Sequence, residues 1–99
     1  MGSKTVRGAG MVWYRSGDYS RILEIMSDAD KLSPTFEQWR VSAERGEREM
    51  KSKGFLIVRA MIDPEEFATR CAARGIHPDA KARTEFAAEF AQQHFGKTH

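Results

Sequence analysis

The sequence predicts a mostly helical α+β domain in which a short apolar strand is covered by amphipathic helices. Three observations lead to this fold class. Phe55 to Ile62 alternates between two faces that are almost entirely apolar, which is typical of a strand buried on both sides. Several segments with apolar residues spaced by three and four follow a helix-capping residue. At 99 residues, the chain has the size of one domain.

The N-terminal part predicts an arm, a short strand and a helix. Residues 1–10 contain three glycines and are expected to form a flexible arm ahead of a single globular domain over residues 11–96. Met11 to Arg15 carries bulky and aromatic side chains and predicts a strand. Asp18 is expected to cap a helix that reaches about Asp28, with its buried face formed by Tyr19, Ile22, Leu23 and Met26.

A second helix is predicted over about residues 34–53. Its start is either Pro34 in the first turn or Thr35 paired with Gln38 in a capping box. Its apolar stripe includes Gly46, which indicates either a close approach by another element or a local kink. Its outer face carries opposite charges four residues apart, among them Glu47 with Lys51.

The C-terminal half predicts two more helices. Asp63, Pro64 and Glu66 suit the first turn of a helix over 64–74 that ends at Gly75. Asp79 is expected to cap a last helix over about 80–95, with a buried stripe of Phe86, Ala87, Phe90, Ala91 and Phe95.

The predicted order is therefore β-α-α-β-α-α, with a small two-stranded sheet covered by four helices. Two strands alone make a marginal sheet. The inner strand must accordingly be covered by helices or extended by a strand of another chain, which would make a homodimer.

The charge pattern gives weak support for nucleic-acid binding. The net charge is +2, but the first fifteen residues hold Lys4, Arg7 and Arg15 and no acid. The rest of the chain carries 13 basic and 14 acidic side chains, so the predicted domain is not a polycation. No apolar run approaches the roughly 20 residues that a membrane span requires. The polar start of the chain and the single cysteine favour a cytoplasmic protein.

No residue pattern points to catalysis, a cofactor or a metal ion. Close histidine or cysteine pairs with metal-ligand spacing do not occur, nor does a phosphate-binding glycine loop after a strand. Cys71 and His77 could form a thiol and its base, but a cysteine on the inner face of a helix is more often a buried apolar residue. The helices at 64–74 and 80–95 have helix-turn-helix lengths, yet Glu85 and Glu89 on the second would repel phosphates.

One segment combines aromatic rings with positive charge. Trp13, Tyr14 and Arg15 stand near Lys4 and Arg7 in the sequence, and together they are candidates for contacting a protein partner or single-stranded nucleic acid. The alternative places both aromatic rings in the core. The leading hypothesis is a non-enzymatic protein-interaction or regulatory module, self-association included. The second hypothesis is a weak nucleic-acid-binding accessory protein.

Three runs resemble short, uncharacterised bacterial proteins that are labelled hypothetical. They are Trp13-Tyr14-Arg15, Leu32 to Trp39 and Asp63 to Phe67, and the resemblance spans about residues 11–95. This group has no agreed activity. The resemblance therefore implies a bacterial protein and assigns no functional residue.

Overall fold

The computed structural model describes residues 7–96 and confirms the predicted class and element order. The elements are β1 (Arg7–Trp13), α1 (Tyr19–Ile25), α2 (Phe36–Ser52), β2 (Phe55–Met61), α3 (Pro64–Arg74) and α4 (Ala80–Phe95). Two short 3-10 turns, η1 (Ser16–Asp18) and η2 (Ala29–Lys31), lie on either side of α1.

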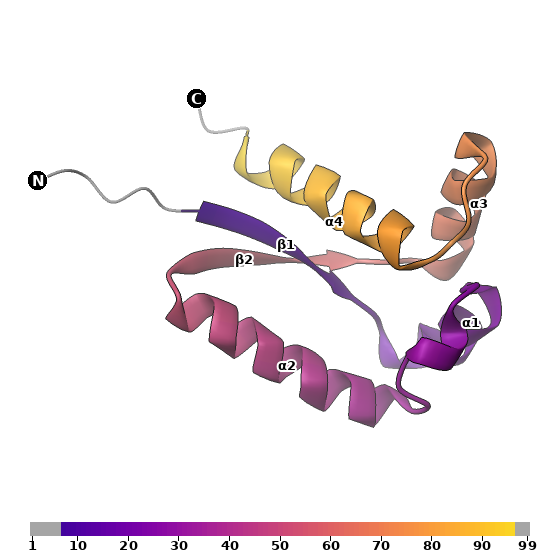
Figure 1. Cartoon of the computed structure of the whole chain (residues 1–99), viewed down its shortest axis with the longest axis horizontal. Helices are drawn as coiled ribbons and strands as arrows, with labels where there is room; N and C mark the ends of the chain where they lie inside the picture. The colour runs from indigo at the N-terminus through magenta and orange to yellow at the C-terminus, as the bar shows by residue number, and fades with distance from the viewer. Residues whose placement is uncertain (1–6, 97–99) are drawn as a thin grey trace, which may run out of the picture.

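The strands β1 and β2 run parallel and form a sheet between two helical layers. Arg7 lies opposite Phe55, and Trp13 lies opposite Met61. Parallel strands need a long crossover, which α1 and α2 provide. The helix α4 covers one face of the sheet and α2 the other, while α1 and α3 lie at the end where both strands finish (Figure 1).

The main core lies at this carboxyl end of the strands. Its buried cluster contains side chains from α1, α3 and α4 and from the residues that directly follow β1, α1 and β2: Tyr14, Tyr19, Ile22, Met26, Ile62, Phe67, Cys71 and Ala82. Trp13 and Tyr14 extend the cluster toward α2, where their ring centroids lie 5.1 and 4.8 Å from that of Trp39.

Local capping residues fix where most helices begin. The side chains of Thr35, Asp63 and Asp79 each accept a hydrogen bond from the backbone N–H three residues later, at 3.2, 3.0 and 3.0 Å. Of the two starts considered for α2, the one at Thr35 is therefore correct. The expected side-chain cap at Asp18 is absent. Asp18 lies in η1, and its Oδ2 is 3.5 Å from Arg15 Nη1 instead of accepting from the first turn of α1. The helix α1 also ends at Ile25, earlier than expected.

The first strand begins at Arg7 and ends at Trp13, so its predicted limits of Met11 and Arg15 are wrong. Residues 7–10, expected to form part of a flexible arm, belong to β1 and pack against α4. Residues 1–6, Lys4 included, lie outside the described residues.

Burial of β2 on both sides holds only toward its carboxyl end. Ala60 and the following Ile62 are fully buried, but Leu56 is 53% exposed because α4 packs mainly on β1. Glu47 was also expected on the exposed face of α2, and it is buried because it pairs with Arg59 of β2. At Gly46 a Cβ would lie 3.3 Å from Met11 Cε, which supports a close approach by β1.

Candidate functional site

An open groove of about 610 Å³ lies between β1 and α4. Consecutive residues Gly8–Val12 form one side of it. The other side is a stripe of α4 whose exposed members, Thr84, Ala88 and Gln92, are four residues apart. Among the lining residues that the structure describes, none is charged, although 30% of the chain is charged. We call this feature the β1–α4 groove.

Two glycines of β1 allow α4 to lie close to the strand. A Cβ at Gly10 would overlap the backbone carbonyl of Ala87 and lie 3.2 Å from the Ala91 Cβ. A Cβ at Gly8 would overlap the ring of Phe95. The alternating glycines are therefore required by the packing of α4, and they leave the backbone of β1 thinly covered on this side.

The same stretch of β1 has an edge without a neighbouring strand among residues 7–96, which we call the outer edge. Ile62 N–H donates to Trp13 O at 2.9 Å, so the backbone groups of Trp13 face β2. Because the direction of N–H and C=O groups alternates along a strand, those of Gly8, Gly10 and Val12 face the outer edge. The groove thus presents backbone donors and acceptors beside an uncharged surface.

The strand β2, which forms the opposite edge of the sheet, carries a charged residue on the side that faces α2. The Arg59 guanidinium donates to both carboxylate oxygens of Glu47, each at 2.8 Å, and lies 3.8 Å above the Trp13 ring. These hydrogen bonds hold the pKa of Glu47 below its usual value. A charged side chain that points inward on an edge strand is a common device against pairing with other chains. The described part of β1 has no such residue between Gly8 and Trp13.

A buried ion pair fixes the first turn of α4 and therefore the position of the groove. Arg83 Nη1 and Nη2 donate to Asp28 Oδ1 and Oδ2 at 2.8 and 2.9 Å, and the two side chains are only 11% and 14% exposed. The hydrogen bonds from Arg83 lower the pKa of Asp28. Nearby, burial raises the pKa of Tyr14 to about 12, so this phenol stays neutral.

Comparison with protein families gives a match over most of the chain. Residues 17–98 match the family described as a domain of unknown function (DUF8829). The chain belongs to this family. No curated protein and no solved structure matches the chain. The DUF8829 match includes α4 and begins after β1, and its description assigns no activity, so it adds no functional residue. The expectation that no family with an assigned function would be found is confirmed.

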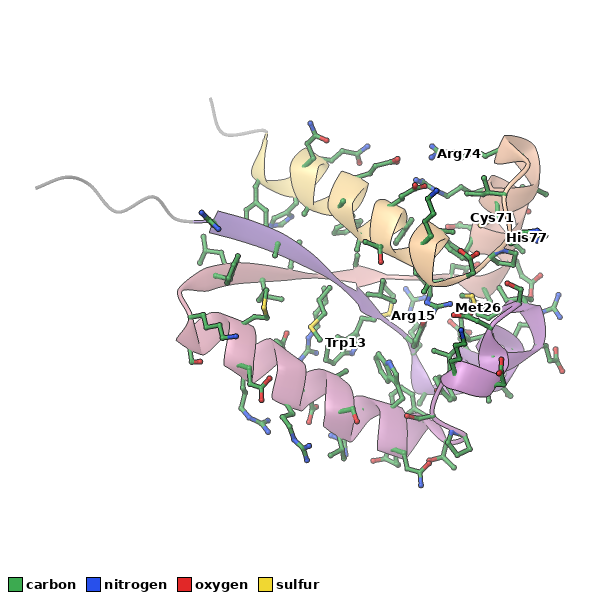
Figure 2. All side chains as sticks on the ribbon, viewed as in Figure 1. Trp13, Arg15, Met26, Cys71, Arg74 and His77 are labelled. Atoms are coloured by element: carbon green, nitrogen blue, oxygen red, sulfur yellow. The ribbon has the colours of Figure 1, made fainter. Side chains whose placement is uncertain are left out.

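The residues predicted from the sequence to contact a partner do not form an exposed patch. Trp13 is 5% exposed and Tyr14 is 2% exposed, because both rings pack in the core. Figure 2 shows Trp13 in the layer between the sheet and α2, and Arg15 just beyond the end of β1. Arg7 and Arg15 are exposed, and Lys4 lies outside the described residues. The aromatic planes are therefore not available for stacking on bases.

The cysteine considered as a nucleophile is buried. Cys71 is 1% exposed, and its burial raises the pKa of the thiol, which reduces its reactivity. His77 lies on the exposed connection between α3 and α4. Within residues 7–96, no three metal-ligating side chains are grouped as an ion site would need. Over the same range, no helix combines the length and the apolar character needed to cross a membrane.

The groove residues were missed because none carries a chemical motif. The available signal is the spacing of Gly8 and Gly10 by two residues, which is compatible with a strand packed closely against a neighbour, together with an uncharged stripe through Ala88 of α4.

Proposed function

We propose that the protein is an interaction module that binds an extended polypeptide segment in the β1–α4 groove. The segment adds as a strand to the outer edge of β1, and its side chains contact α4. This mode of recognition takes most of its affinity from main-chain hydrogen bonds and its selectivity from the side chains that meet the neighbouring surface.

The observation that carries this proposal is the coincidence of an unpaired strand edge with an uncharged groove. Edge strands are commonly protected by charged residues, and β2 carries Arg59. The outer edge of β1 instead has Gly8, Gly10 and Val12 beside small α4 residues. An arriving segment meets no charge that it must desolvate there.

A displayed library of random decapeptides, selected against the purified protein, tests this proposal. We expect the selected peptides to lose at least about tenfold in affinity when Ala88→Lys places a charge in the groove. Ala73→Lys is the matched control, because it makes the same change at an exposed position of α3, away from the groove. Bound peptide should also slow amide exchange at Gly10.

The outcome against the proposal is equally specific. If every selected peptide binds the Ala88→Lys variant as tightly as it binds the wild-type protein, the groove is not the docking site. A library that yields no peptide whose affinity falls in the Ala88→Lys variant would also exclude the groove as the docking site.

Nucleic-acid binding remains the competing function, and it would now depend on Arg7, Arg15 and Lys4 without the aromatic rings. A fluorescent single-stranded oligonucleotide, titrated at low and high salt, measures it directly. Salt-dependent binding that Ala88→Lys leaves unchanged would favour this alternative, because phosphate contacts act through counterion release rather than through the groove.

A further inference from the structure

We infer that the segment bound in the β1–α4 groove is β1 of a second copy of this chain. The two strands pair antiparallel, and the twofold axis passes between Gly10 of one copy and Gly10 of the other. This inference rests on the proposed function, because it names the occupant of the same groove. The two sheets then join into one of four strands in the order β2-β1-β1-β2.

The pairing uses every backbone group that the outer edge offers. With Gly10 opposite Gly10 of the second copy, Gly8 lies opposite Val12 and Val12 opposite Gly8. All three are positions whose backbone groups face outward, as inferred from the Trp13 to Ile62 hydrogen bond. Each therefore falls at a hydrogen-bonded position of the antiparallel ladder, so the register is self-complementary.

The charge distribution also fits a second copy. Near a twofold axis each residue meets its own counterpart, so any charge there would meet a like charge. The helix α4 runs in the opposite direction to β1, with Phe95 beside Gly8 and Ala87 beside Gly10 (Figure 1). Ala88, the exposed neighbour of Ala87, consequently lies close to the axis. No charged residue lines the described groove, which satisfies the symmetry condition.

The size of this surface sets the expected strength. The seven residues of β1 extend about 23 Å, and the sixteen of α4 extend about 24 Å, at ordinary strand and helix rises. A surface of this length that is only one strand and one helix wide is small beside standard specific interfaces, which bury about 1,200–2,000 Å² in total. We therefore expect a dimer whose population depends on concentration.

Light scattering over a concentration series tests the inference. The mass should rise from 11.2 kDa at about 1 µM toward twice that value at about 1 mM. Ala88→Lys and Ala88→Glu should each remain monomeric alone, because equal charges meet at the axis. An equal mixture of the two, carrying different tags, should form dimers that contain one copy of each. Ala73→Lys should dimerise like the wild-type protein.

Three results would overturn the inference. One is a wild-type mass of 11.2 kDa at every concentration. Another is dimerisation of the Ala88→Lys variant alone. The third is an equal mixture of Ala88→Lys and Ala88→Glu that stays monomeric. Either of these two results would mean that Ala88 does not lie near the twofold axis. If the wild-type chain is monomeric while library peptides still bind in a manner sensitive to Ala88→Lys, only the second copy is excluded and the proposed function stands. If neither binding event occurs, both fail.

Discussion

Removing the carboxylate of Asp28 should destabilise the protein strongly, because it leaves a buried cation without its partner. Arg83 makes a bidentate contact with Asp28 at 2.8 and 2.9 Å, and both side chains are nearly excluded from solvent. In the Asp28→Ala variant the one hydrogen bond left to the guanidinium among those described is that to Met26 Sδ at 3.4 Å, although Asp79 still attracts its charge. Breaking one side of a buried ion pair typically costs about 3–5 kcal/mol.

The magnitude is large relative to the stability of such a domain. Small domains unfold with free energies of about 5–15 kcal/mol. A loss of about 3 kcal/mol lowers the melting temperature of a domain of this size by about 12 °C or more. Urea denaturation, followed by the fluorescence of the core residues Trp13 and Trp39, measures the free energy of unfolding. The double variant Asp28→Ala, Arg83→Met removes both charges and should regain most of the loss.

Two results would refute this reasoning. A cost below about 1 kcal/mol for Asp28→Ala would give the pair the value of an exposed salt bridge. A double variant as unstable as the single one would show that the unpaired cation is not the cause.

Three further predictions concern pH, packing and thiol chemistry. Arg83 lowers the pKa of Asp28, so the pair stabilises the fold above the unfolded pKa of about 3.9, and this stabilisation disappears as pH falls through the folded pKa. The Asp28→Asn variant should therefore lose less stability on acidification than the wild-type protein. Acid denaturation curves of the same shape for both proteins would contradict this. Gly10→Ala should lower the free energy of unfolding, measured by urea denaturation, by about 1–3 kcal/mol, because the added Cβ overlaps the Ala87 carbonyl. The control Gly17→Ala, where a Cβ has no atom within 4 Å, should change it by less than about 0.5 kcal/mol. Equal effects of the two substitutions would disprove the close approach of α4 to Gly10. The Cys71 thiol should react with Ellman's reagent only as fast as the protein opens, and rapid reaction of the folded protein would show that the side chain is accessible.

Helix starts were predictable because their signals are local. The capping side chains of Thr35, Asp63 and Asp79 act on backbone groups three residues away, so the sequence alone contains the whole interaction. The signal that ends α3 at Gly75 is local as well. Gly75 has a left-handed φ of 66°, and the Ile76 N–H donates to Cys71 O at 3.0 Å.

The N-terminal limit of β1 was not predictable by the same means. Gly8 and Gly10 indicate flexibility when only their neighbours in the sequence are considered. Their actual role comes from Ala87 and Phe95, which are far away in the sequence and occupy the space that side chains at Gly10 and Gly8 would need. Long-range packing therefore reverses the local interpretation.

The ion pairs Glu47–Arg59 and Asp28–Arg83 were missed for a similar reason. Glu47 has a well-placed lysine four residues later, which favours an exposed pair on α2. The structure instead brings Arg59 of β2 to it, and in the same way brings Asp28 to Arg83. Both partners are set by tertiary packing, and a charge spacing along one helix carries no information about them.

Amide exchange at Gly10 tests the central claim most directly. Its N–H faces the outer edge of β1, whereas the N–H of Met11 faces β2 and provides an internal reference in the same strand. We expect exchange at Gly10 to slow toward that of Met11 as the protein concentration rises, and to stay fast in the Ala88→Lys variant. Fast exchange at Gly10 at every concentration and with every selected peptide would contradict the claim that this edge takes up another strand.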